Sequence, residues 1–127
     1  MTIEVIIPTR FPLPRTIAKW AAEELGVDLA ELCTSEIRGK PLARRGGGFT
    51  HRISRARQIA VTLMREYTSA SYLEIQRELG MKSSASPQYQ HRTARLRLCE
   101  QDDPEWLEAY ARVRARVERE MHRGPRS

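Results

Sequence analysis

The chain has 127 residues, with 22 Lys and Arg against 16 Asp and Glu, so its formal net charge is +6 and its isoelectric point is about 9.9. This length suits one domain, and the 40% hydrophobic and 30% charged residues are typical of a soluble folded protein rather than a disordered chain. A membrane-spanning helix is excluded because no apolar run approaches about 18 residues, and the first ten residues do not have the pattern of a secretory signal.

The positive charge is concentrated in the middle of the chain. Residues 38–97 contain thirteen basic and three acidic residues, a balance of +10, whereas residues 1–37 and 100–127 have balances of −3 and −1. Within the central segment, residues 38–57 and 82–97 contain no acidic residue. Two such segments on either side of a helix suit a polyanionic ligand, although a solvated basic surface would have the same composition.

The first third of the chain is predicted to contain an arm, two helices and a loop. Residues 1–8 alternate weakly and predict a short strand or an extended arm. Helical spacing predicts a helix from about Arg15 to Leu25, with the glycine that follows as its stop, and Asp28 is the predicted cap of a short helix over residues 29–33. Residues 38–49, which include three successive glycines, predict a flexible basic loop.

The next two predicted helices have clear sequence signals. Apolar residues at steps of three and four predict a helix from Ser54 to about Tyr67 with one buried face. Ser71 and Glu74 form a capping box at the start of a short helix, which Gly80 ends.

Two further helices are predicted at the C-terminal end. Ser86 is the predicted cap of a helix to about residue 99, with Pro87 in its first turn. Asp103 is the predicted cap of the last helix, with Pro104 at its first position. This last helix has an apolar stripe, which indicates either packing on the protein's own core or a surface for a partner: Trp106, Tyr110, Val113, Val117 and Met121. Since strand signals are confined to the first residues, the predicted fold class is all-α.

No pattern typical of an enzyme or a metal site was found. The glycine run at residues 46–48 lacks the Lys and Ser or Thr of a phosphate-binding loop. The three histidines share no metal-ligand spacing with one another or with the cysteines, and the acids at residues 100–108 suit a helix N-terminus. Cys33 and Cys99 are predicted to be buried free thiols in a reducing compartment, with a disulfide as the weaker alternative. We therefore predict a protein that is not an enzyme and has no cofactor.

A capped short helix, a glycine, a turn and a second, basic helix follow one another in the order of a helix-turn-helix motif. The second helix of that motif enters the major groove of DNA, and its N-terminal residues contact base edges. A plain helical bundle with a basic face is the alternative. Amide, hydroxyl and imidazole groups of the second helix are the predicted base readers, and its arginines the predicted phosphate contacts: Ser84, Ser86, Gln88, Tyr89, Gln90 and His91, then Arg92, Arg95 and Arg97.

Four segments, at residues 53–63 (ISRARQIAVTL), 65–68 (REYT), 71–75 (SYLEI) and 79–80 (LG), have the spacing of a known pattern. They resemble the C-terminal DNA-binding domain of the bacterial replication initiator DnaA. The resemblance implies an all-α helix-turn-helix fold of the type shared with Trp repressor, with duplex DNA as its ligand. It divides the chain into an arm at residues 1–12, a DNA-binding domain at 13–99 and an added helical extension at 100–127.

The resemblance also implies individual contacts. The loop arginine that enters the minor groove falls near His51 or Arg52, and Arg57, Gln58 and Arg65 correspond to phosphate contacts. The family's base-reading segment corresponds to residues 80–87, which share only the first glycine and the basic Lys82 with it, so we expect a base specificity that differs from that of the family. The complete predicted interface is Arg44, Arg45, His51, Arg52, Arg55, Arg57, Gln58, Arg65, Lys82, Ser83, Ser84, Ser86, Gln88, Tyr89, Gln90, His91, Arg92 and Arg95.

Together these patterns predict a DNA-binding regulator that controls replication initiation or transcription by occupying sites. It would act in the cytoplasm on the nucleoid, encoded by a bacterial chromosome or a phage, and it lacks the ATPase module of the full-length initiator. The alternative is an adaptor with weak DNA binding, which would bind another protein of the initiation machinery through residues 1–25 or 104–121. A homodimer, or a replication or transcription protein, would then contact Trp106, Tyr110, Val113 and Val117.

Overall fold

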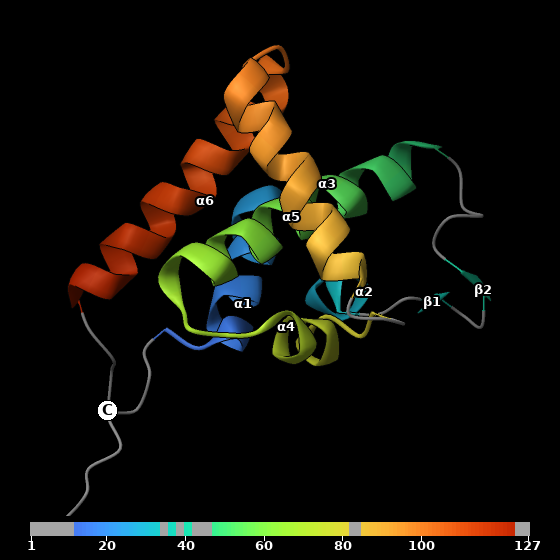
Figure 1. The fold of residues 1–127 in the computed structure, drawn as a ribbon, viewed down its shortest axis with the longest axis horizontal. Coiled ribbons are helices and arrows are strands. Elements are labelled where there is room, and N and C mark those ends of the chain that lie inside the picture. The colour runs from blue at the N-terminus through green and yellow to red at the C-terminus, as the bar shows by residue number, and fades with distance from the viewer. Residues whose placement is uncertain (1–11, 34–35, 38–39, 42–46, 82–84, 124–127) are drawn as a thin grey trace, which may run out of the picture.

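The computed structural model describes residues 12–33, 36–37, 40–41, 47–81 and 85–123, and side chains within 12–33, 52–81 and 85–123. In these ranges the chain forms six α-helices (Figure 1). Two strands of two residues each, β1 (Glu36–Ile37) and β2 (Lys40–Pro41), pair in antiparallel orientation. The prediction of an all-α fold is therefore confirmed in its main elements, while the predicted arm at residues 1–8 lies outside the described ranges.

The first two helices begin and end as their local chemistry predicts. Helix α1 (Pro14–Leu25) ends at Gly26, whose φ of 65° is in the left-handed region that favours glycine. Helix α2 (Leu29–Leu32) is capped by Asp28, whose carboxylate accepts a hydrogen bond from the Ala30 amide at 2.8 Å. Both predicted signals are confirmed.

Helix α3 (Gly47–Tyr67) lies at the centre of the bundle and is longer than predicted. It begins at Gly47 rather than Ser54, so residues 47–49 are helical and not part of a loop. The early start escaped prediction because glycines have low helix propensity and the first turns contribute no periodic apolar face. From residue 53 onward the helix contributes many buried side chains, among them Ile59, Leu63 and Met64.

Helices α4 (Tyr72–Glu78) and α5 (Ala85–Glu100) follow. The predicted capping box at the start of α4 is present, with the Glu74 amide donating to Ser71 Oγ at 3.2 Å. Helix α5 begins at Ala85, so Ser86 lies inside the helix and is not its cap, which corrects the prediction. Its third residue is Pro87, which the helix tolerates because the first four backbone N–H groups have no intrahelical acceptor.

Helix α6 (Pro104–Arg123) is capped by Asp103, whose carboxylate accepts a hydrogen bond from the Trp106 amide at 3.1 Å. Helices α5 and α6 diverge from their connecting turn like the arms of an inverted V (Figure 1). The apolar stripe of α6 faces inward: Trp106, Tyr110, Val113 and Val117 are buried in the core, and Met121 packs against it half-buried. These four residues therefore pack on the protein's own core, the first of the two alternatives expected for the stripe, and a partner contact stays a prediction.

The core lies between α1, α3 and α6, with α5 packed along α3. Ion pairs join the first helix to the last, where Arg116 of α6 contacts Glu24 at 3.0 Å and Glu23 at 3.7 Å. None of the helices in the described ranges is long and apolar enough to cross a membrane. This packing covers one face of α5 and leaves its other face open to solvent.

Candidate nucleic-acid interface

One continuous face of α5 is exposed, and its polar residues are neutral or basic. Residues seven positions apart on the opposite side, Pro87 and Ala94, are buried and fix the rotation of the helix. The exposed residues recur at steps of three and four, so they share one side of the helix. We call them the α5 face: Ala85, Gln88, Tyr89, Arg92, Arg95, Leu96 and Cys99. The exposed fractions of Tyr89 and Leu96 reach 64% and 54%.

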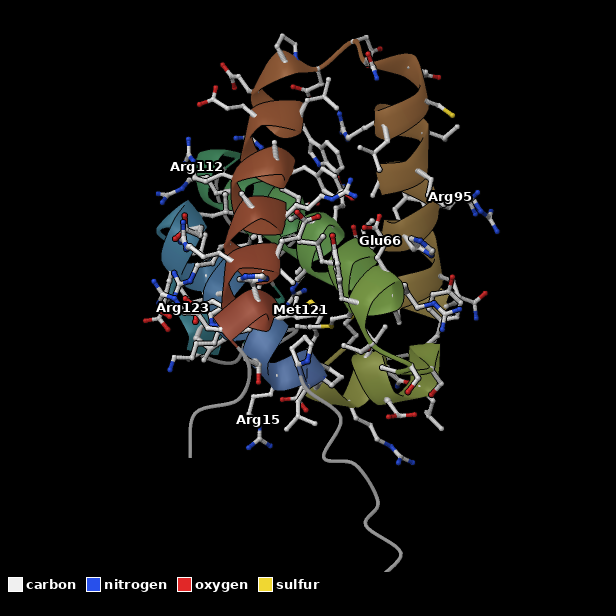
Figure 2. All side chains as sticks on the ribbon, turned by 90° about the vertical axis from the view of Figure 1, so that its left-hand side faces the viewer. Arg15, Glu66, Arg95, Arg112, Met121 and Arg123 are labelled. Atoms are coloured by element: carbon white, nitrogen blue, oxygen red, sulfur yellow. The ribbon has the colours of Figure 1, made fainter. Side chains whose placement is uncertain are left out.

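The two arginines of the α5 face differ from most arginines elsewhere in the molecule. Within the described part of the chain, neither Arg92 nor Arg95 forms an ion pair with an acidic side chain, and Arg95 points away from the bundle (Figure 2). Seven of the other twelve arginines with described side chains are paired with acids: Arg15 with Glu78, Arg55 with Glu105, Arg97 with Asp103, Arg112 with Glu108, Arg114 with Glu118, and Arg116 and Arg123 with Glu120. Cationic charge at the α5 face is thus not neutralised within the described structure.

Two shallow hollows flank His91 beside the α5 face. One has a volume of about 370 Å³, and its lining includes Gln88, His91, Arg92 and Arg95 but no acidic residue. The other, of about 440 Å³, lies toward α3 and includes Glu66. Only the first therefore presents hydrogen-bond donors and cations without an opposing carboxylate.

The start of α4 is tied to the middle of α5 by a short chain of contacts. The Tyr72 hydroxyl lies 2.7 Å from His91 Nδ1, and the Arg65 guanidinium lies 4.5 Å from the centre of the Tyr72 ring. Arg65 also donates a hydrogen bond to the Ala70 carbonyl oxygen at 2.8 Å. Burial, together with the cations Arg65 and Arg95, lowers the pKa of His91 below its ordinary value. The imidazole is therefore predominantly neutral near pH 7.

Two residues that the DnaA resemblance assigns to phosphate contact form hydrogen bonds within the protein. Gln58 is only 7% exposed, and its Oε1 accepts a hydrogen bond from Trp106 Nε1 at 3.0 Å. The guanidinium of Arg57 is half-buried, and its Nε donates to the Leu32 carbonyl oxygen at 3.0 Å. Burial lowers the pKa of Arg57. Both residues thus join α3 to neighbouring helices, and the phosphate role that the resemblance implies for them stays a prediction.

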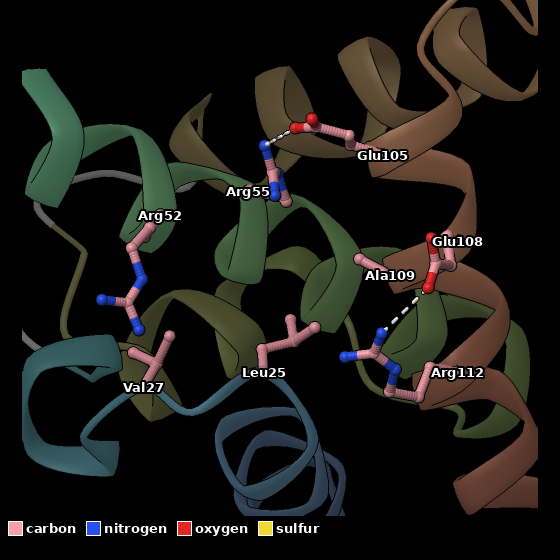
Figure 3. A pocket seen from close by; sticks show the side chains of 8 residues that line it. All are labelled: Leu25, Val27, Arg52, Arg55, Glu105, Glu108, Ala109 and Arg112. Atoms are coloured by element: carbon pink, nitrogen blue, oxygen red, sulfur yellow. Dashed lines mark hydrogen bonds and ion pairs between the residues drawn. The ribbon is translucent and has the colours of Figure 1, made fainter.

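Arg52 and Arg55 lie in a different place from the α5 face. They line a pocket of about 240 Å³ at the junction of α1, α3 and α6 (Figure 3). There Arg52 donates to the Gly26 carbonyl oxygen at 3.0 Å, and Arg55 lies 3.6 Å from the Glu105 carboxylate. The basic residues of α3 and α5, for which the sequence predicts one interface, therefore lie in more than one place on the molecule.

The remaining predicted residues either have described side chains away from the α5 face or lie outside the described side chains. Ser86 and Gln90 are half-buried on the sides of α5, and the carboxamide oxygen of Gln90 has no hydrogen-bond partner among the described residues. Arg97, predicted to contact phosphate, is instead paired with Asp103 at 2.8 Å. The rest lie outside the ranges with described side chains: Arg44, Arg45, His51, Lys82, Ser83 and Ser84.

The two free cysteines differ in accessibility, which corrects the prediction that both are buried. Cys99 is exposed because it continues the α5 face, whereas Cys33 is half-buried and burial raises the pKa of its thiol. We expect iodoacetamide to modify Cys99 well before Cys33 in the native protein, as measured by peptide mass mapping over time. The Cys99→Ser variant should lose the fast phase; equal rates for both thiols would contradict the placement of α5.

No known protein indicates what the α5 face binds. Searches against protein-family models, curated proteins and solved structures find no match to the chain. Among the described residues, no group of three or more His, Cys, Asp or Glu side chains is placed to hold a metal ion. The distinguishing property of the α5 face is a row of exposed donors and cations on one regular helix.

Proposed function

We propose that this protein binds duplex DNA as a helix-turn-helix regulator, with α4 as the first helix of the motif and α5 as the helix that enters the major groove. By occupying DNA sites it would control replication initiation or transcription. The major groove is wide enough to admit one α-helix. An exposed helix whose acid-free face has amides and guanidinium groups offers the donors that base edges and phosphates require.

The observation that carries this proposal is the presence of Arg92 and Arg95 on the α5 face with no acidic partner among the described residues. Gln88 and Tyr89 lie one turn closer to the N-terminus of α5, where residues of a reading helix meet base edges. The tyrosine hydroxyl and the glutamine amide can donate to base edges or to phosphates, and the arginines suit backbone phosphates.

The DnaA-like segments support the same proposal. They fall on α3, α4 and the turn after α4, the elements against which α5 packs. The chain adds α6, whose apolar stripe completes the core. In this proposal α6 stabilises the bundle and α5 makes the contact with DNA.

The test is fluorescence anisotropy with a labelled duplex of arbitrary sequence, titrated at several salt concentrations. We expect affinity to fall linearly with salt on logarithmic axes, and Arg92→Ala to reduce that slope by about 0.9, because one phosphate contact no longer releases a counterion. The matched control is Arg119→Ala, which removes an exposed arginine of α6 and should leave the slope unchanged. No duplex binding by the wild-type protein at low salt would overturn the proposal.

Exposed Tyr89 and Leu96 favour one second candidate, an adaptor that binds an acidic protein of the initiation machinery. Large exposed apolar side chains among cations are typical of protein interfaces. Capture from nuclease-treated lysate separates the two functions: a partner that is retained after nuclease and lost with Tyr89→Ala supports the adaptor. Binding that disappears with nuclease supports DNA.

A further inference from the structure

The acid-free hollow beside α5 is built from donors that converge on one small volume. We call it the His91 pocket, lined by Tyr72, Gln88, His91, Arg92, Arg95, Leu96 and Cys99. Two guanidinium groups, one carboxamide and one imidazole surround it, and its volume of about 370 Å³ gives ample room for a phosphate group. Such a donor set suits an oxyanion.

We propose that the His91 pocket holds one backbone phosphate of bound DNA, and that Tyr72 is the positioning residue that presents His91 to it as a hydrogen-bond donor. The inference rests on the proposed function and names one contact within it. It also gives a role to Tyr72, a residue outside the interface that the sequence predicts.

The orientation of the imidazole follows from its contacts. The Tyr72 hydroxyl lies 2.7 Å from Nδ1, so Nε2 is the ring nitrogen left for a ligand, and in this proposal it donates into the His91 pocket. Arg65, stacked over the Tyr72 ring at 4.5 Å and bonded to the Ala70 carbonyl oxygen, holds the phenol in place. The position of the ring is therefore fixed from α3 and α4, not from α5 alone.

The protonation state of His91 follows from its surroundings. Arg65 and Glu66 face it from α3, Tyr72 from α4 and Arg95 from its own helix. Burial and the two cations outweigh the opposite effect of Glu66 and lower the pKa of His91, so the imidazole is neutral at mildly alkaline pH. A neutral ring has one acceptor and one donor nitrogen; when the Tyr72 O–H donates to Nδ1, the proton resides on Nε2. The pocket then receives an N–H donor.

The position of the pocket agrees with a phosphate ligand rather than a base. It lies on the side of α5 next to the start of α4, and in helix-turn-helix complexes the first helix crosses the DNA backbone. Base edges would meet the opposite side of the α5 face, where Tyr89 lies. The pocket therefore lies where a strand of the duplex would leave the groove.

The test compares three variants in the salt titration described above, at mildly alkaline pH. We expect His91→Ala to weaken binding roughly ten- to a hundredfold, the effect of losing one hydrogen bond to a charged group. The salt slope should stay unchanged, because a neutral donor releases no counterion. By contrast, Arg95→Ala should reduce the slope by about 0.9. His91→Gln, whose amide nitrogen can occupy the position of Nε2, should recover most of the affinity.

Tyr72→Phe tests the positioning role, since it removes the hydroxyl but keeps the ring beneath Arg65. We expect a smaller loss of affinity than for His91→Ala. Nitrogen-15 NMR of the free protein should show the Nε2–H tautomer of His91 in the wild type and a tautomer mixture in Tyr72→Phe. This readout needs no DNA, so it examines the positioning independently of the proposed function.

The outcomes separate the two proposals. Duplex binding that is unchanged in His91→Ala, or a lower salt slope for that variant, would overturn the phosphate contact while leaving the DNA-binding function intact. An Nδ1–H tautomer in the wild type would overturn the role of Tyr72. A wild-type protein that binds no duplex would overturn the phosphate contact together with the proposed function.

Discussion

Trp106→Ala is expected to lower the free energy of unfolding by about 3–5 kcal/mol, the range for removing a large aromatic side chain from a core. Trp106 is 1% exposed and stacks on Tyr110 with ring centres 5.4 Å apart. The substitution removes this packing and also leaves Oε1 of buried Gln58 without its donor. Urea unfolding followed by far-UV circular dichroism measures the change.

Two further variants separate packing from hydrogen bonding at Trp106. Trp106→Phe keeps most of the apolar contact but leaves the Gln58 carboxamide unpaired, so we expect a loss of about 1–3 kcal/mol. Combining it with Gln58→Leu should recover part of that loss, because both polar partners are then gone. A cost below about 1 kcal/mol for Trp106→Ala would contradict the structure, since it would mean that α6 does not complete the core.

The sequence predicted helix ends well because their signals are local. Asp28, Ser71 and Asp103 each bond to a backbone amide two or three residues further along the chain, so the interaction does not depend on the rest of the fold. The start of α3 at Gly47 was missed for the converse reason, because nothing in that glycine-rich turn favours a helix locally.

The roles of polar residues on α3 could not be predicted from residue type. Gln58 and Arg57 have the chemistry of phosphate ligands, but α3 is covered by neighbouring helices along much of its length. Side chains there bond to Trp106 and to the Leu32 carbonyl oxygen because buried polar groups need partners. The packing of α1, α2, α5 and α6 around α3 decides which polar residues face inward.

The sequence also does not predict which face of α5 is buried. Its buried positions include Pro87 and Ala94, small residues that do not mark an apolar face, while Leu96 is exposed. The predicted readers Gln88 and Tyr89 and the predicted phosphate contacts Arg92 and Arg95 are exposed, whereas the predicted readers Ser86 and Gln90 are half-buried. Placing Tyr72 against His91 required the packing of α4 on α5, since these residues are 19 positions apart.

Charge reversal at both arginines of the α5 face is expected to have the largest effect on DNA binding. Arg92→Glu with Arg95→Glu should weaken duplex binding roughly a hundredfold or more, since each charge-assisted contact contributes about 1.5–3 kcal/mol. Two new carboxylates beside the DNA backbone would add repulsion. The salt slope should fall by about 0.9 for each phosphate contact that is lost.

Stability should change little in this double variant, because both side chains are exposed and neither has an acidic partner among the described residues. We expect the free energy of unfolding to stay within about 0.5 kcal/mol of wild type. The matched control, Arg112→Glu with Arg119→Glu on α6, changes net charge by the same amount at residues outside the α5 face. If the control weakened binding as much as the α5 variant, overall charge rather than the α5 face would determine affinity. If the α5 variant kept most of its affinity for duplex DNA, the contact with DNA would lie on another part of the chain.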